Sequence, residues 1–458
     1  MLDILFKGLA FIVAISVLVA VHEYGHYWVA RQLGFKVLRF SIGFGRPLLR
    51  WRSKDADQVE YWISAIPLGG YVKMLDEREE EVPAAEAHRA FNRRPIPARI
   101  AVLLAGPGAN FLFAVAAFWL IYVTGVEGYR PYIEDVRPGT VAAAADLRAD
   151  DIIESVGGTS TETLDQALVA MFDELLGDGI IELEVVAADG DRRSLALDVR
   201  DRIGELTEPD ALFDGLGIVI GPRVPAVVGS VSEGSAGESA GLREGDRIAA
   251  IDGRTITYFS ELADYVTPRP GQTIAITVER DGQRLELAAD IGSATEGGQT
   301  IGRLGVGSRP DTRENLAARV LTERRYGPLE GIGVAASETW AMTALTTRMI
   351  GRMLTGEVSL RNASGPIMIA NYAGEYAQAG FNAFLRFLCM ISISLGIMNL
   401  LPVPILDGGQ IVMSVIEGIK GSPLSLRAAV IGQQIGLAML IALMSVVFYN
   451  DITRLLGL

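Results

Sequence analysis

This chain of 458 residues contains four long apolar runs. Each run approaches the length of about 20 residues that a helix needs to cross the hydrocarbon core of a bilayer. A single run of this kind could be a buried helix of a soluble protein, but four of them favour membrane-spanning helices. The sequence therefore predicts four transmembrane helices, at residues 1–34, 98–124, 382–402 and 428–450.

The positive charges indicate how these helices are oriented. Loops at the cytoplasmic face of a membrane carry an excess of Lys and Arg. These residues are concentrated in the segment 35–97 and recur in the segment 403–427. We therefore expect both loops to be cytoplasmic, and both termini and the long segment between the second and third helices to be extracytoplasmic. No positive n-region or small-residue cleavage site flanks the first run, so we expect a retained helix there.

The long outer segment contains an internal repeat. Leu147–Ile153 recurs with changes as Leu242–Ile248, and each copy continues with a helix-like stretch and a β-rich stretch that contains an Asp-Gly turn. The repeat predicts two tandem α+β domains, at residues 125–214 and 215–308. The segment 309–381 predicts an amphipathic helical region that lies on the membrane or against the domains, or that is a plain packing helix.

Composition excludes some classes of function. Half of the residues are hydrophobic (50%), and the formal net charge is −14. An acidic chain without a basic stripe or a nucleic-acid motif is not expected to bind nucleic acid. The one cysteine, Cys389, allows no intramolecular disulfide, and the spacing of a Cys/His zinc finger is absent.

Candidate chemistry lies inside the first apolar run, where two histidines stand four residues apart. Ionisable groups are costly in a bilayer and usually mark a functional site. On a helix, His22 and His26 lie one turn apart on the same face, with Glu23 beside them. This arrangement suits a Zn2+ ion held by the two imidazoles, with Glu23 as the general base. A pair of hydrogen-bonded core histidines is the alternative.

A catalytic zinc requires a third protein ligand. Asp407 is the candidate, because it is a lone acid just after the third apolar run and is followed by two glycines that let the backbone approach closely. On its own, the Asp-Gly-Gly sequence would indicate a helix-ending turn. Since both motifs lie toward the predicted cytoplasmic side, we expect Asp407 to be a ligand.

Three further motifs complete a pattern that resembles the site-2 protease family of intramembrane metalloproteases. Asn399–Gly409 resembles the family's second metal motif, Gly106–Phe111 resembles its Gly-Pro motif, and Ile66–Tyr71 resembles part of its membrane-associated β-hairpin. The whole chain is similar to the regulator-of-sigma-E type, which has two tandem PDZ domains. The implied fold is membrane α-helical, with four transmembrane helices, a membrane-associated β-hairpin within residues 35–97 and two α+β PDZ-like extracytoplasmic domains.

The resemblance implies an intramembrane zinc metalloendopeptidase of the bacterial inner membrane that acts in regulated intramembrane proteolysis and stress response. Its partners would be the lipid bilayer and single-pass membrane proteins, such as an anti-sigma factor or signal-peptide remnants. It also implies a role for Asn399 in handling the substrate or the oxyanion. Binding of the substrate as an added strand is implied for Tyr61, Ile63, Gly69 and Gly70.

The second repeat resembles a PDZ domain more closely than the first. One run, which we assign to the second domain, resembles the loop that holds a peptide carboxylate: Gly215, Leu216, Gly217 and Ile218. The first copy departs from the pattern, because Asp146 and Asp150 stand where glycines are expected. A purely steric module is therefore the alternative for the first copy.

Three other functions are open on the sequence alone. They are a non-catalytic, membrane-anchored PDZ peptide-binding receptor, a soluble-type zinc peptidase with a membrane anchor, and an ion or solute transporter. The position of the metal motif inside an apolar helix argues against the second, and no inverted repeat supports the third. Metal content and the effect of changing Glu23 distinguish the receptor from the peptidase.

Overall fold

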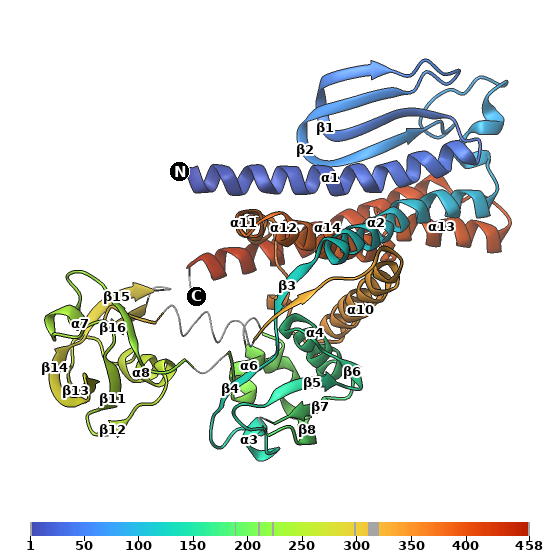
Figure 1. Ribbon diagram of the computed structural model, residues 1–458. Helices are drawn as coiled ribbons and strands as arrows, with labels where there is room; N and C mark the ends of the chain where they lie inside the picture. The colour runs from blue at the N-terminus through green and yellow to red at the C-terminus, as the bar shows by residue number, and fades with distance from the viewer. Residues whose placement is uncertain are drawn as a thin grey trace. The chain divides into compact units, whose positions relative to one another are not determined.

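The computed structural model describes residues 2–187, 189–208, 211–221, 224–296, 299–309 and 320–456. Two compact units divide the chain. The first, Met1–Val126 with Arg324–Leu455, holds the long helices and a β-sheet, and the second, which is mainly Glu127–Glu323, holds the two repeats (Figure 1).

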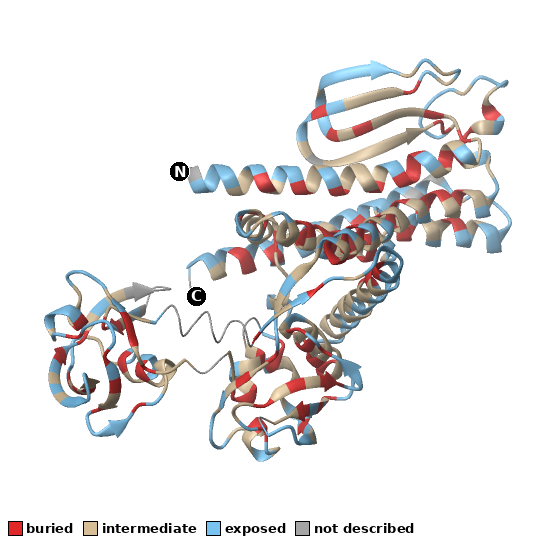
Figure 2. Cartoon of the chain, in the orientation of Figure 1, coloured by how far each residue is buried: buried red, intermediate tan, exposed pale blue. Residues whose placement is uncertain are grey.

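Within the described residues, four helices are long and apolar enough to cross a membrane, as the hydrophobic pattern predicts. Only 17% of the most apolar window of α1 and 11% of that of α14 is buried, against 39% for α2 and for α12. The exposed apolar surfaces of α1 and α14 (Figure 2) are therefore available to lipid. The bounds are α1 (Leu2–Gln32), α2 (Ile96–Thr124), α12 (Phe381–Leu400) and α14 (Leu426–Leu456).

The helix α2 is at the centre of the helical core, where it contacts α1, α10 (Pro328–Thr355) and α12. Small residues allow the backbones of α1 and α2 to approach closely. A Cβ atom built on Gly25 of α1 would lie 2.2 Å from the carbonyl oxygen of Ala105 on α2. The crossing point of the two helices is thus fixed next to the histidine motif. Leu18, Phe118 and Tyr122 are among the buried side chains of this core.

The structure contains a helix, α13 (Asp407–Lys420), in the segment 403–427 that the sequence analysis described as a loop. Asp407 begins this helix and does not end one. A Cβ atom on Gly408 or Gly409 would lie 2.2 Å from a backbone oxygen of the preceding turn. The glycines therefore let α13 start close to the end of α12, which is the close backbone approach that the sequence predicts; the alternative of a helix-ending turn is not what the structure has.

The predicted helical region 309–381 contains α10, α11 (Pro366–Gln378) and the short helix η4 (Leu360–Asn362). It also contains a strand, β18 (Leu321–Arg324), which pairs with β3 (Val126–Tyr129). Residues 310–319 lie outside the described residues. From residue 320 onward the segment is therefore mainly helical, with one strand, β18, ahead of its helices.

The predicted hairpin is formed by two long, bent strands, β1 (Val37–Arg52) and β2 (Glu60–Met74), which lie beside the C-terminal half of α1 (Figure 1). Because each strand bends back, residues 60–64 pair on one side with 47–52 and on the other with 39–42. Residues 39–42 pair in turn with 70–73, which form one outer edge of the sheet. Two short helices follow, η1 (Ala87–Arg89) and η2 (Phe91–Arg93).

The two repeats form two modules with separate hydrophobic cores, a first module at residues 131–221 and a second module at residues 224–309. Their four-stranded sheets have the same strand order, β6-β5-β7-β8 and β12-β11-β13-β14. The elements of the first are β4 (Ile133–Val136), α3 (Val141–Ala144), β5 (Ile152–Val156), β6 (Thr159–Ser160), α4 (Leu164–Leu175), β7 (Ile180–Val186), β8 (Arg192–Asp198), η3 (Arg200–Arg202), α5 (Ile203–Leu206), α6 (Ala211–Leu216) and β9 (Ile218–Ile220). Those of the second are β10 (Val228–Val231), α7 (Ala236–Ser239), β11 (Arg247–Ile251), β12 (Arg254–Thr255), α8 (Phe259–Val266), β13 (Thr273–Arg280), β14 (Gln283–Asp290), β15 (Gly292–Glu296), β16 (Gln299–Arg303) and β17 (Val306–Ser308).

A similar ion pair, with its aspartate buried, occurs in both modules, although its arginine comes from β8 in the first module and from β13 in the second. Asp151 accepts the backbone N–H of Arg148 and pairs with Arg193. Its counterpart Asp246 accepts the backbone N–H of Arg243 and pairs with Arg280. In each module the repeated Leu-Arg-x-x-Asp sequence therefore ties a turn to a strand of the sheet.

Each module is closed by its last strand, which pairs with its first: β9 with β4, and β17 with β10. The run Gly215–Ile218 therefore belongs to the first module, and the predicted boundary between residues 214 and 215 is wrong. Gly217 accepts the N–H of Arg137, and Gly305 accepts the N–H of Ser232, each at 2.8 Å. The counterpart of the run in the second module is thus Arg303–Val306. The sequence prediction assigned this run to the module that follows it in the chain, whereas the strand that completes a module is the last one of that module.

Candidate metal centre and catalytic cavity

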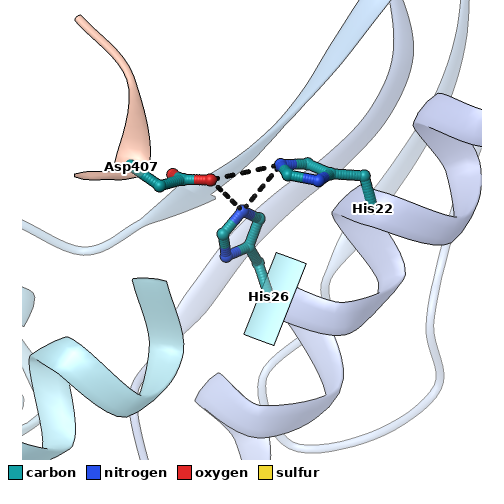
Figure 3. Close-up of side chains that lie close together, drawn as sticks. All are labelled: His22, His26 and Asp407. Atoms are coloured by element: carbon teal, nitrogen blue, oxygen red, sulfur yellow. Dashed lines mark hydrogen bonds and ion pairs between the residues drawn. The ribbon is translucent and has the colours of Figure 1, made fainter. Parts of the chain in front are cut away.

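His22 and His26 lie one turn apart on α1, and both are buried. Their Nε2 atoms are 3.1 Å apart, and the planes of the two rings meet at 82°. Helical geometry alone accounts for the shared face, because residues i and i+4 are neighbours on a helix. The two ring nitrogens therefore point to one place, as Figure 3 shows.

Asp407 completes the cluster from the first turn of α13 (Figure 3). Its Oδ2 atom lies 3.3 Å from Nε2 of His22 and 3.3 Å from Nε2 of His26. The same oxygen has no hydrogen-bond partner among the described residues. Three potential ligand atoms from two distant parts of the sequence thus face one another, with both histidines buried and Asp407 partly buried.

The cluster fits a zinc ion. Zinc bonds of about 2.0–2.1 Å in a tetrahedral arrangement separate any two ligand atoms by about 3.3 Å. The three separations in the cluster, 3.1, 3.3 and 3.3 Å, agree with this value. Two imidazoles and one carboxylate also make a donor set that is typical of catalytic zinc, which leaves a fourth position for water or substrate.

The helix α2 fixes the positions of both histidine rings. Nδ1 of His26 lies 2.7 Å from the carbonyl oxygen of Val102, so a proton on Nδ1 is donated there and Nε2 remains free to bind a metal. A Cβ atom on Gly106 would lie 2.2 Å from Nε2 of His26 and 2.8 Å from Cε1 of His22. The imidazoles therefore occupy space that any side chain at position 106 would fill.

A cavity of about 930 Å³ opens beside the cluster. It is lined by all three candidate ligands, by Glu23 and by Asn399 of α12. The structure therefore brings together the residues that sequence analysis selected for catalysis, although they come from three separate helices.

The outer edge of the sheet lines the same cavity through Gly69 to Met74. Gly69 and Gly70 thus lie where the sequence analysis expected, next to the candidate catalytic residues. A Cβ on Gly70 would lie 3.0 Å from Cγ of Glu23.

Tyr61 and Ile63 are placed differently from the prediction. They lie on an interior segment of the sheet, paired on both sides, and do not line the cavity. The hydroxyl of Tyr61 forms a 2.6 Å hydrogen bond with that of Tyr27, and its ring stacks on Trp51. Their alternating pattern correctly indicated a strand, but the bends that decide which segment is an edge could not be seen in the sequence.

A buried ion pair links the two helices that surround the cluster. Arg99 of α2 donates to Glu417 of α13 at 2.7 Å and to Ser414 at 3.1 Å. Both charged side chains are about nine-tenths buried. Since Asp407 begins α13, this pair holds the helix that presents the third candidate ligand. Sequence reasoning did not find it, because the partners are far apart in the chain.

Comparison with known proteins places the chain in a family. The model of "Peptidase family M50" matches residues 10–443. The chain is 40% identical over 461 residues to the "Regulator of sigma-E protease RseP" of Escherichia coli (strain K12), covering 99% of this chain and 100% of the relative. It is 38% identical over 459 residues to a "Putative zinc metalloprotease" of Vibrio cholerae, covering 99% and 100%.

A solved PDZ domain of the SdrC-like protein from Listeria innocua matches 18% of this chain and 92% of its own length, at 26% identity and a TM-score of 0.17.

The site and the family agree on the class of protein, which is a zinc-dependent metalloprotease of the site-2 protease type. The chain belongs to peptidase family M50. With four helices of membrane length, it is an inner-membrane protein. The expectations of a metalloprotease and of zinc as its cofactor are therefore confirmed.

Proposed function

We propose that this protein is an intramembrane endopeptidase that cleaves the membrane-spanning segments of single-pass membrane proteins. In this proposal His22, His26 and Asp407 hold the zinc, and Glu23 is the general base. One observation carries the proposal: the three ligand atoms meet 3.1–3.3 Å apart, with Glu23 in the same cavity, on a helix of membrane length. Chemistry placed there acts on substrates within the membrane.

When bound, zinc supplies a Lewis acid that polarises a peptide carbonyl and lowers the pKa of water. Glu23 takes the proton from the attacking water and delivers it to the leaving amine. Asn399 donates a hydrogen bond from its side-chain amide to the carbonyl oxygen as negative charge develops there. The two histidines are largely buried, which lowers the local dielectric constant and strengthens these electrostatic interactions.

The edge strand Gly69–Met74 is proposed to bind the substrate. A transmembrane helix satisfies its backbone hydrogen bonds internally, so its peptide bonds are accessible only after local unwinding. An unwound segment regains those hydrogen bonds when it adds to the exposed edge of a sheet. The edge and the cluster line one cavity, so a strand bound there would pass directly beside Glu23.

The site is proposed to lie near the cytoplasmic face. The Lys and Arg content of the loops favours a position of the end of α1, at Gln32, on that side. At a rise of about 1.5 Å per residue, His26 is about 9 Å along the axis from Gln32. Both termini and both modules would then be extracytoplasmic.

The substrate class is proposed from this topology and from the relatives. The E. coli relative is named "Regulator of sigma-E protease RseP". On that basis we propose an anti-sigma factor as substrate, with signal-peptide remnants as a second group. We propose that the two modules are PDZ-like and that they admit substrates already shortened on the outer side. Their paired closing strands leave sheet edges at which an extended peptide could add.

The test uses purified full-length protein with a fluorescent single-pass substrate in detergent and in liposomes. Glu23→Gln is expected to bind zinc as the wild type does and to lose cleavage, because the amide cannot accept the proton. Glu81→Gln, the same chemical change at an exposed position of the loop after β2, is the control and should cleave normally. Cleavage by Glu23→Gln at the wild-type rate would refute the proposed base.

A second experiment tests the proposed filter. Replacing residues 131–309 with a flexible linker should let the protein cleave substrates with large outer domains that the full chain rejects. A folded, zinc-loaded deletion protein with unchanged selectivity would contradict the role of the modules but would leave the catalytic proposal intact.

A further inference from the structure

Asn110 is a fully buried polar residue on α2 that the mechanism above does not use. Its side-chain amide nitrogen lies 3.2 Å from Nδ1 of His22, on the ring edge that faces away from Asp407. Its other side-chain atom, Oδ1, has no hydrogen-bond partner among the described residues. A buried amide oxygen without a partner is costly and calls for an explanation.

The tautomer of His22 supplies an explanation for this amide oxygen. With the amide nitrogen donating to Nδ1, the neutral ring carries its proton on Nε2, which faces Asp407. A metal at Nε2 requires the opposite tautomer, with the proton on Nδ1 and a free lone pair on Nε2. The proton on Nδ1 then needs an acceptor at the position that the amide occupies.

A half-turn of the amide provides this acceptor. Nitrogen and oxygen of an Asn side chain are nearly the same size and exchange places when the terminal torsion turns by about 180°. The rotation puts Oδ1 of Asn110 next to Nδ1 of His22. Oδ1 then accepts the Nδ1 proton, and the ring is fixed in the tautomer that binds a metal. The amide nitrogen takes the position that Oδ1 held, where no partner lies among the described residues.

We propose that Asn110 is a positioning residue of the metal centre, which accepts the Nδ1 proton of His22 through Oδ1. The inference rests on the proposed zinc site. His26 has the equivalent arrangement, since its Nδ1 lies 2.7 Å from the carbonyl oxygen of Val102. Both acceptors come from α2, two turns apart, on either side of Gly106. One helix therefore sets the tautomer of both histidines and makes room for their rings.

A helix-packing role is the competing explanation, because buried Asn residues also join transmembrane helices. The packing contact at this position is made by the backbone, however, not by the amide. Ser392 of α12 donates its hydroxyl to the carbonyl oxygen of Asn110 at 2.9 Å and is itself fully buried. Ser392→Ala is thus a matched control, which removes a buried hydrogen bond at the same residue without touching the imidazole.

The experiment measures the affinity of the metal-free protein for zinc, by competition with a chelator of known affinity in detergent. Asn110→Leu should weaken zinc binding about 10- to 100-fold, as is usual when the hydrogen-bond partner of a ligand is removed. Asn110→Asp, which retains an acceptor for the Nδ1 proton, should bind within a few-fold of wild type. Ser392→Ala should bind zinc as the wild type does, whatever its thermal stability.

Each outcome has a defined meaning. Equal zinc affinity of Asn110→Leu and wild type would overturn the inference, as would an equal loss in Ser392→Ala. If the wild type itself binds no zinc, the proposed function fails instead. Should Asn110→Leu not fold, nitrogen NMR of histidine-labelled, zinc-loaded wild type decides. The inference requires His22 to bind through Nε2 with its proton on Nδ1, and binding through Nδ1 would overturn it.

Discussion

Gly106 offers the sharpest test of how the two helices build the metal centre. A Cβ at this position would lie 2.2 Å from Nε2 of His26, 2.6 Å from its Cε1 and 2.8 Å from Cε1 of His22, where ordinary contacts are 3.4–4 Å. In Gly106→Ala the imidazole of His26 must therefore move by roughly 1 Å, and zinc ligation tolerates about 0.2 Å. We expect zinc affinity to fall at least about 100-fold, or roughly 2.8 kcal/mol.

Gly108 is the matched control, two residues further along α2. A Cβ there meets nothing within 4 Å, so Gly108→Ala changes the helix without touching the histidines. In both variants Ala favours the helix by about 1 kcal/mol over Gly, so poor helix formation cannot explain a loss of zinc in one of them. The assay is chelator competition on metal-free protein. Zinc binding by Gly106→Ala within threefold of Gly108→Ala would refute the reasoning.

Three further perturbations probe the scaffold. Arg99→Leu leaves Glu417 buried without its partner, which should lower stability by about 3–5 kcal/mol and lower the melting temperature in detergent; an unchanged value would show that the pair is dispensable. Asp451→Ala removes a fully buried carboxylate that accepts three backbone N–H groups at the start of α11. The free energy of unfolding should therefore fall by about 3 kcal/mol. Hydrogen exchange in α11 should become faster, and zinc affinity should not change. Burial alone would raise the pKa of Asp246, but the Arg280 guanidinium holds this pKa below its ordinary value of 3.8. The ion pair therefore stabilises the module above pH 3.8, and this stabilisation is lost as the pH falls below that value. Asp246→Asn should remove this pH dependence, measured as hydrogen-exchange protection in β11 and β13.

The sequence was most informative where ligands and base lie within one helical turn. His22, Glu23 and His26 share a face for reasons of helix geometry alone, so their spacing predicts their proximity. Asp407 needed context, because a single acid before two glycines is also a turn signal. Its approach to the histidines depends on where α13 starts relative to α12, which is a property of packing.

Other parts of the site could not be predicted from local patterns. The roles of Asn110 and Gly106 depend on the crossing point of α1 and α2, which no residue spacing specifies. The edge strand at Gly69–Met74 was separated from the interior strand at Tyr61 only by the bends of β1 and β2. These bends use Gly43 and Gly69, whose φ values of +85° and +111° favour glycine.

The predicted position of the boundary between the modules was wrong for a topological reason. The repeat motifs gave the number of modules and much of their internal order. They did not show that the first strand of each module pairs with its last. A run placed just before the second repeat was therefore assigned forward, to the module whose motif followed it. Strand pairing over about eighty residues, which β4 and β9 show, is invisible to local periodicity.

The central claim is that His22, His26 and Asp407 bind one zinc ion, and zinc content tests it most directly. Wild type and Glu23→Gln, dialysed against a weak chelator and measured by elemental analysis, should each retain one zinc per chain. Asp407→Asn and His22→Phe should retain almost none under the same dialysis, while remaining folded by circular dichroism. One tightly bound zinc in the folded Asp407→Asn protein would contradict the account.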